Sequence, residues 1–328
     1  MQNFIEHIHI KNFKSIKHCE IEKCGRINLF IGRPNVGKSN ILEALSLFSI
    51  PYLRENTTKK LSGLIRLENE SELFYNGQTD YESSITTNLA SCTLRYNSKE
   101  GLSAVLNYYL ETIFEVTIDA SLFVRGLSKP RFFEPNIKKY SFKQNVAYKK
   151  GHAKYLIPPF GFNLLSVIEQ YKQLKKEVIG FFNDYGLEIA FDKGSQTIKI
   201  IQKGKDGIFL IPYNSVADTL QRIIFYKAAI ASNSNAVLLF EEPEAHSFPP
   251  YMTHLTQEML YKNDNQYFIA THSPFILNDL LENGRDQLAV FIVYYEHSET
   301  KLRQLSSIEL HEILQDGIDI FTNSESFV

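Results

Sequence analysis

The sequence predicts an α/β fold in which a buried sheet brings a phosphate-binding loop and two further strand ends to one site. Three observations predict it. A G-x-x-x-x-G-K-S motif lies at 32–39, between a short apolar run and a helical pattern. A second apolar run, 236–240, ends in two adjacent acids, and a third run within 265–277 ends in Thr-His-Ser-Pro. Open α/β sheets bind ligands beyond the carboxyl ends of their strands, so these segments are expected to meet.

The phosphate-binding loop has the flanking elements that the motif requires. Residues 26–31 are suited to a buried strand, and 39–48 place apolar side chains at helical spacing. Backbone N–H groups of the loop and the helix start would cradle phosphates, Lys38 would reach the β and γ phosphates, and Ser39 would bind Mg²⁺. The expected nucleotide contacts are Gly32, Asn35, Val36, Gly37, Lys38, Ser39 and Asn40.

Two residues of the loop are unusual. Pro34 removes one N–H group and restricts φ. Asn35 stands where glycine is frequent, and asparagine is the other residue that tolerates a positive φ well. We therefore expect a left-handed backbone at Asn35.

Many GTP-dependent switch proteins have the same phosphate-loop sequence, but this chain lacks the other motifs that such proteins require. None of the eleven Asp residues is followed by Gly three positions later, as a γ-phosphate switch requires. The dipeptide Asn-Lys, which begins a guanine-reading motif, does not occur. The sequence therefore favours ATP over GTP.

The acids after the second strand suit metal-dependent hydrolysis. Glu241 would hold Mg²⁺ through water, and Glu242 would orient or deprotonate the attacking water. His272, after the third strand, would contact the γ-phosphate. A single strand that ends in acids is usually just a surface feature, so the prediction depends on all three strand ends together.

The order NFKSI, GRPNVGKSN, LLFEEPEAH and FIATHSPFIL resembles the ABC-type ATPase heads of the RecF, SMC and Rad-fifty group, and most closely the OLD and Septu ATPases. The resemblance implies a P-loop head with a mixed sheet, an antiparallel β subdomain and a small α+β insertion. It also implies ATP and Mg²⁺ as cofactors and dimerisation of the heads, as a homodimer or higher oligomer.

The resemblance also implies residue roles. Glu241 matches the Mg²⁺ acid, although that position is usually Asp, while Glu242 matches the catalytic glutamate and His272 the switch histidine. Lys14, in the opening turn, would approach the nucleotide. The stretch EAHSFPP resembles the loop that contacts the partner subunit.

The family's signature motif is altered in this chain. The candidate lies at 213–230 and reads Ser215-Val216-Ala217, with Ala in place of the usual Gly. Ser215 would cap the following helix and reach the nucleotide of the partner subunit in trans. A bulkier Ala would hold the phosphate further away, so turnover could be slow. A core helix without nucleotide contact is the alternative.

We expect a head formed by 1–90 and 206–328, with 91–205 as an inserted lobe. Within the lobe, 161–186 predicts one helix of about six turns, and three short strands follow it.

Residues 125–154 carry nine basic side chains and one acid, Glu134, a local charge of +8. The basic residues are Arg125, Lys129, Arg131, Lys138, Lys139, Lys143, Lys149, Lys150 and Lys154. Interleaved with them are Phe132, Phe133, Tyr140, Phe142 and Tyr148. Nucleic acid, an acidic protein partner and a plain solvated loop all remain open.

Composition limits the function classes. The chain has 328 residues, 44% hydrophobic and 22% charged, with a net charge of -2. That is typical of a globular protein and gives no overall attraction for nucleic acid. Cys19, Cys24 and Cys92 lack metal-site spacing, which predicts reduced thiols. The charged N-terminus and the absence of an 18-residue apolar run predict a cytoplasmic protein without membrane contact.

Two functional hypotheses follow. The first is a Mg²⁺-dependent ATPase that regulates a separate effector, such as a nuclease, in anti-phage defence or DNA repair. OLD proteins carry a nuclease after the ATPase, but 278–328 contain no Asp-x-Asp motif, so the effector is expected to act in trans. The second is an assembly protein held together by nucleotide, with negligible turnover.

Overall fold

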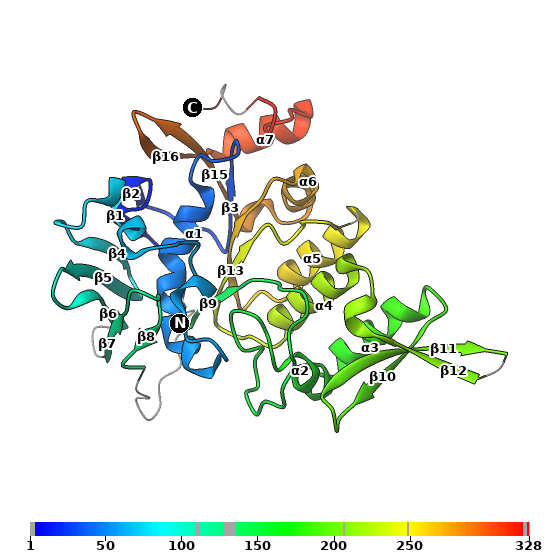
Figure 1. Ribbon diagram of the computed structural model, residues 1–328. Helices are drawn as coiled ribbons and strands as arrows, with labels where there is room; N and C mark the ends of the chain where they lie inside the picture. The colour runs from blue at the N-terminus through cyan, green and yellow to red at the C-terminus, as the bar shows by residue number, and fades with distance from the viewer. Residues whose placement is uncertain are drawn as a thin grey trace. The chain divides into compact units, whose positions relative to one another are not determined.

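The computed structural model of the chain describes residues 4–108, 112–127, 136–205, 207–247, 249–323 and 327 (Figure 1). The chain divides into two compact units. Unit 1 comprises 1–139, 235–242 and 264–328, and unit 2 comprises 140–234 and 243–263.

Unit 1 contains two sheets over the residues that the structure describes. The first sheet has the order β2-β1-β4-β5-β6-β7-β8 and is antiparallel throughout. Its strands are β1 (Ile8–Phe13), β2 (Ile16–Ile21), β4 (Ser83–Thr87), β5 (Ala90–Asn97), β6 (Gly101–Tyr108), β7 (Thr112–Ile118) and β8 (Val124–Arg125). This sheet confirms the predicted antiparallel subdomain.

The second sheet has the order β16-β15-β3-β14-β13-β9. Its strands are β3 (Ile27–Ile31), β9 (Ile137–Tyr140), β13 (Val237–Glu241), β14 (Gln266–Ala270), β15 (Leu288–Glu296) and β16 (Glu299–Gln304). Strands β13, β14, β3 and β15 pair in parallel, and β16 returns antiparallel. Strands β3 and β14 are buried along their whole length, and their sequences are mainly apolar, as expected for parallel strands covered on both faces.

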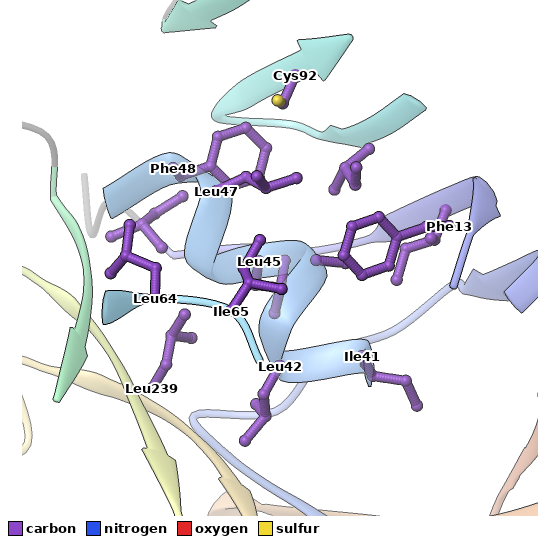
Figure 2. Close-up of a cluster of buried hydrophobic side chains, with 14 of the residues drawn as sticks. Phe13, Ile41, Leu42, Leu45, Leu47, Phe48, Leu64, Ile65, Cys92 and Leu239 are labelled. Carbon is purple, nitrogen blue, oxygen red and sulfur yellow. The ribbon is translucent and has the colours of Figure 1, made fainter. Parts of the chain in front are cut away.

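Helix α1 (Lys38–Ser46) lies in the core of unit 1. Figure 2 shows its apolar side chains in one cluster, with Cys92 of β5 on one side of the helix and Leu239 of β13 on the other. Leu42, Leu45 and Phe48 are fully buried there. Each such side chain contributes about 1.5–3 kcal/mol through burial, so this cluster holds the phosphate-loop helix between the two sheets.

The remaining helices of unit 1 are short. After α1 the chain continues as a 3₁₀ helix, Leu47–Glu55, which includes Pro51. Helix α6 (Pro274–Asn283) follows β14, and α7 (Ser307–Asp316) follows β16. Strands β15 and β16 with α7 confirm the prediction that the C-terminal segment completes the head.

Unit 2 combines helices with a small antiparallel sheet of order β10-β11-β12. Its strands are β10 (Glu188–Asp192), β11 (Thr197–Gly204) and β12 (Gly207–Pro212), as the sequence predicted. Its helices are α2 (Leu164–Gln170), α3 (Lys172–Asn183), α4 (Asp218–Ala231) and α5 (Pro249–Tyr261).

The single helix predicted at 161–186 is wrong. The structure has two helices, separated at Tyr171, whose backbone is extended with φ -104° and ψ 96°. The Tyr171 hydroxyl donates a hydrogen bond to the carbonyl of Lys154, 2.7 Å away. Since neither Gly nor Pro stands at the break, the local pattern gave no sign of it.

The first boundary between the two compact units lies after residue 139, whereas the sequence predicted it at residue 91. Strands β5 to β8 continue the sheet that β1, β2 and β4 begin, so 91–125 lie in the same unit as the phosphate loop. The second unit instead starts at 140 and takes in α4 and α5.

Across the described ranges, the structure contains no helix that is both long enough and apolar enough to span a lipid bilayer.

Candidate active site

Three predicted segments meet at one edge of the parallel sheet in unit 1. Strands β3, β13 and β14 run in the same direction, so their carboxyl ends lie together. The phosphate loop follows β3, Glu241 ends β13, and Thr271 and His272 follow β14. The structure therefore brings Lys38, Glu241, Glu242 and His272 into one site.

The phosphate loop is formed but Lys38 is turned back onto it. Lys38 is buried, and its Nζ donates to the carbonyls of Gly32 at 2.8 Å and Arg33 at 2.7 Å. Burial lowers the pKa of Lys38 to about 8, although the nearby charge of Glu242 opposes this shift. Asn35 has φ 62°, which confirms the expected left-handed backbone.

Helix α1 begins immediately after the loop with its first N–H groups facing the site. Gly37 is the N-cap, with φ 98°, and among the described residues no side chain caps this helix start. A helix N-terminus without a cap favours an anion, because unpaired N–H groups and the helix dipole both attract negative charge.

Gly37 is required by its surroundings as well as by its φ. A Cβ atom at Gly37 would lie 2.0 Å from Oγ1 of Thr300, on β16. Thr300 is fully buried, and its hydroxyl donates to the carbonyl of Val36 at 2.9 Å. Its Oγ1 also lies 2.6 Å from Oγ of Ser15, which accepts a bond from Nδ2 of Asn40 at 2.6 Å. The loop is thus held by the β1–β2 turn and by β16, and the Asn40 side chain is directed to that turn.

Replacing Thr300 with Val is expected to weaken nucleotide binding several-fold and to lower the free energy of unfolding by about 1–3 kcal/mol. The change keeps the shape of the side chain but leaves the partly buried carbonyl of Val36 and the hydroxyl of Ser15 without this partner. Titration with a fluorescent nucleotide and a thermal melt measure both effects. Thr117→Val, at an exposed position of β7, is the control. Unchanged affinity and stability in Thr300→Val would show that this bond does not hold the loop.

Glu241 is held by three neighbours. Its Oε1 lies 2.6 Å from a terminal nitrogen of Arg66, and its Oε2 lies 3.3 Å from Nζ of Lys139. The hydroxyl of Ser39 donates to the same carboxylate. Burial would raise the pKa of Glu241, but Lys139, Ser39 and Arg66 together hold it below its usual value. Glu241 is therefore an anion in this site.

The oxygens of Ser39 and Glu241 fit a magnesium site. They come from α1 and from the end of β13, and the hydrogen bond between them brings both oxygens to one place. Mg²⁺ prefers hard oxygen ligands and commonly takes one or two from the protein and the others from water and substrate phosphates. These two residues would hold the ion, which would neutralise charge on the phosphates.

Glu242 has a backbone that its residue type rarely adopts. Its φ is 42°, and its N–H donates to the carbonyl of Ala270 in β14 at 2.8 Å. A left-handed non-glycine residue costs of order 1–3 kcal/mol and persists where the surrounding structure enforces it. The Glu242 side chain is half exposed, and its Oε1 lies 3.8 Å from Nε2 of His272.

His272 is placed by the turn that begins α6. Ser273 caps that helix, with its hydroxyl accepting from the N–H of Ile276, and Pro274 occupies the first helical turn. Burial and the charge of Lys38 lower the pKa of His272, although Glu242 opposes them. The imidazole is therefore neutral near pH 7 and can both donate and accept a hydrogen bond.

Lys14 is also in unit 1, but its side chain is directed to another partner. Its Nζ lies 2.5 Å from Oε2 of Glu43, which is fully buried in α1, and 2.7 Å from the carbonyl of Arg66. Oε1 of Glu43 accepts from Nε of Arg66 at 3.2 Å. Lys14 therefore supports the charged network around the site rather than pointing at the loop.

The altered signature lies in unit 2, and its helix begins later than expected. The N-cap of α4 is Ala217 and has no side-chain cap, so the prediction that Ser215 caps the helix is wrong. Ser215 ends a 3₁₀ turn, Tyr213–Ser215, and Val216 is extended with ψ 155°. That extended residue separates Ser215 from the helix start.

The described basic side chains of 125–154 are of two kinds: two are buried, and the others, Arg125, Lys143, Lys149, Lys150 and Lys154, are exposed. In unit 1, Lys138 and Lys139 are buried, with Lys138 over the ring of Tyr52, and Arg125 pairs with Asp119 at 2.9 Å. In unit 2, the rings of Tyr140 and Phe142 pack on Phe225, and Tyr148 packs on Tyr213. Lys129, Arg131, Phe132, Phe133 and Glu134 lie outside the described residues. The described rings thus pack on other aromatic side chains, while five of the basic side chains stay exposed, so nucleic acid, a protein partner and a solvated loop all remain open for this segment.

Sequence reasoning missed five residues of the site: Ser15, Glu43, Arg66, Lys139 and Thr300. Only Glu43 carried a signal, as a carboxylate on an otherwise apolar helix face. Arg66 and Lys139 are 175 and 102 positions from Glu241, and Thr300 is 264 positions from Val36. Their roles depend on tertiary contacts.

Comparison with known proteins shows similarity to ATPases. The family model described as an AAA ATPase domain matches residues 4–156. The DNA replication and repair protein RecF of Caldanaerobacter subterraneus is 26% identical over 137 residues, which cover 39% of this chain and 36% of that protein. An ATP/GTP phosphatase of Helicobacter pylori is 32% identical over 94 residues, which cover 26% and 25%. The chain thus matches 36% of the length of the first of these curated relatives and 25% of the length of the second.

Solved SMC heads have the same fold. An SMC head bound to the C-terminal winged-helix domain of ScpA aligns with a TM-score of 0.54 at 14% identity, over 96% of this chain and 100% of that one. A Pyrococcus furiosus Smc head bound to the C-terminal domain of ScpA aligns with a TM-score of 0.50 at 12% identity, over 95% and 99%. The match to an AAA ATPase domain over part of the chain and the similarity to part of RecF support an AAA-type ATPase, and the chain shares the fold of the SMC heads.

Proposed function

We propose that this protein binds Mg²⁺ and ATP at the β3, β13 and β14 strand ends and hydrolyses the γ-phosphate bond. The observation that carries the proposal is the convergence of Lys38, Ser39, Glu241, Glu242 and His272 on one sheet edge, with the Ser39 hydroxyl bonded to Glu241. That set provides a cation for the phosphates, two oxygen ligands for one metal ion and a candidate general base in one place.

Each residue has a distinct role in the proposed reaction. Lys38 exchanges its loop carbonyls for oxygens of the β and γ phosphates. Ser39 and Glu241 would hold the metal, which would supply positive charge beside the phosphates. Glu242 accepts a proton from the attacking water, and neutral His272 donates a hydrogen bond to the γ-phosphate.

The wider role is a regulatory one. We propose that two heads close on ATP, with the 213–230 segment of one facing the nucleotide of the other, and that hydrolysis reopens them. The cycle would control a separate effector in anti-phage defence or DNA repair. Both SMC heads compared above were solved with the partner protein ScpA, which supports a protein partner for this fold.

A second candidate function is nucleotide-stabilised assembly with negligible turnover. It is favoured by Ala217 in place of the signature glycine and by the uncapped start of α4. In that case ATP would hold subunits together without being consumed.

Single-turnover hydrolysis separates the two functions. The protein, in excess over radiolabelled ATP, is incubated with Mg²⁺, with and without duplex DNA. Conversion of bound ATP to ADP within minutes is expected for the regulatory ATPase. Bound ATP that persists for hours would instead support the assembly role, and no binding at all would contradict both.

A further inference from the structure

The carboxylate of Glu241, which is expected to bind the metal, already forms ion pairs with two cationic side chains. Arg66 reaches Oε1 of Glu241 at 2.6 Å, and Lys139 approaches Oε2 at 3.3 Å. A metal ion approaching Glu241 therefore meets positive charge on both oxygens.

The two cations differ in how firmly they are held. Lys139 is buried, and its Nζ also donates to the carbonyl of Leu64 at 2.9 Å. The side chain of Arg66 is 69% exposed, so its guanidinium can move into solvent at little cost. Arg66 is the partner that can leave.

Arg66 also bonds to Glu43, and it can keep these bonds when its guanidinium moves away from Glu241. Its backbone N–H and its Nε donate to Oε1 of the buried Glu43, at 3.1 and 3.2 Å. If Arg66 also broke its bonds to Glu43, that buried carboxylate would lose a partner, which is costly. Displacement from Glu241 therefore breaks one ion pair and leaves the other in place.

We propose that Arg66 is a cationic placeholder on Glu241, which occupies the carboxylate in the metal-free site and is displaced by Mg²⁺. Arg66 is thus a positioning residue that preserves the Glu241 anion and sets the cost of loading the metal. This inference rests on the proposed function, because it takes Glu241 as a metal ligand.

The test compares nucleotide affinity with and without metal. A fluorescent non-hydrolysable ATP analogue is titrated into the protein in excess Mg²⁺ and in EDTA, and the ratio of the two affinities reports the gain from the metal. Arg66→Gln is expected to raise this ratio about fivefold to tenfold, because Mg²⁺ no longer displaces a cation. Arg95→Gln is the matched control, since Arg95 pairs with Glu82 at 2.5 Å on an exposed surface.

The possible outcomes are distinguishable. Arg66→Gln removes a charge near the phosphates, so weaker binding in EDTA together with a raised ratio supports the placeholder. A ratio that is unchanged or lower than in the wild type overturns the inference, and so does an equal increase in Arg95→Gln. A wild-type protein that does not bind the analogue in either condition overturns the proposed function itself.

A double-mutant cycle tests the contact without nucleotide. The free energies of unfolding of Arg66→Gln, Glu241→Gln and the double variant are measured in EDTA. Non-additive effects are expected, because the two side chains are in contact. Additive effects would contradict a placeholder that rests on Glu241.

Discussion

A Glu242→Gln protein is expected to bind ATP as the wild type does and to hydrolyse it about a thousandfold more slowly. The amide cannot accept the proton of the attacking water, but it keeps the size of the side chain at a position with φ 42°. Phosphate release under single-turnover conditions measures the rate, and nucleotide titration measures the affinity.

The same variant tests dimerisation of the heads. If hydrolysis opens the dimer, Glu242→Gln with Mg²⁺ and ATP is expected to accumulate as a dimer in light scattering. Glu82→Gln, which alters an exposed carboxylate paired with Arg95, is expected to behave as the wild type. Full turnover by Glu242→Gln would exclude Glu242 as the base.

Lys38→Ala is expected to weaken ATP binding by about a hundredfold or more. Lys38 is the buried cation beside the loop, and its Nζ already bonds two loop carbonyls where phosphates are expected. Removing it takes away a charge-assisted bond to the phosphates and leaves the carbonyls of Gly32 and Arg33 facing them. Fluorescent nucleotide titration measures the loss.

The control for Lys38 is a lysine that lies outside the site. Lys17, on β2, has a side chain that is 64% exposed, so Lys17→Ala is expected to retain wild-type affinity. A thermal melt checks that Lys38→Ala is folded. Unchanged affinity in a folded Lys38→Ala protein would contradict the assignment of the phosphate loop.

The sequence predicted the main elements of the site because each depends on local order. Lys38 follows a strand and begins a helix, while Glu241 and His272 each lie at or just beyond the end of a buried apolar run. Parallel strands place such ends at one edge, so the expected convergence needed no long-range information. The left-handed backbone of Asn35 was predictable for the same reason, since it follows from the residue type.

The errors came from contacts that local patterns do not contain. A tyrosine hydroxyl bonded to a distant carbonyl accompanies the break between α2 and α3 at Tyr171. Within the basic segment, the sequence pattern did not show that Lys138, Lys139 and Tyr140 are buried. Ser215 was expected to cap α4, yet one extended residue places the helix start at Ala217 instead.

By itself, the sequence determined which side chains follow the buried strands: a phosphate-loop motif with Lys38, the adjacent acids Glu241 and Glu242, and His272. The tertiary structure alone decided the state of that site. Arg66 and Lys139 cover Glu241, and Thr300 holds the loop, across separations of 102 to 264 residues. The physical reason is that motif chemistry is encoded by neighbours in sequence, whereas the charge around a carboxylate depends on every element packed against it.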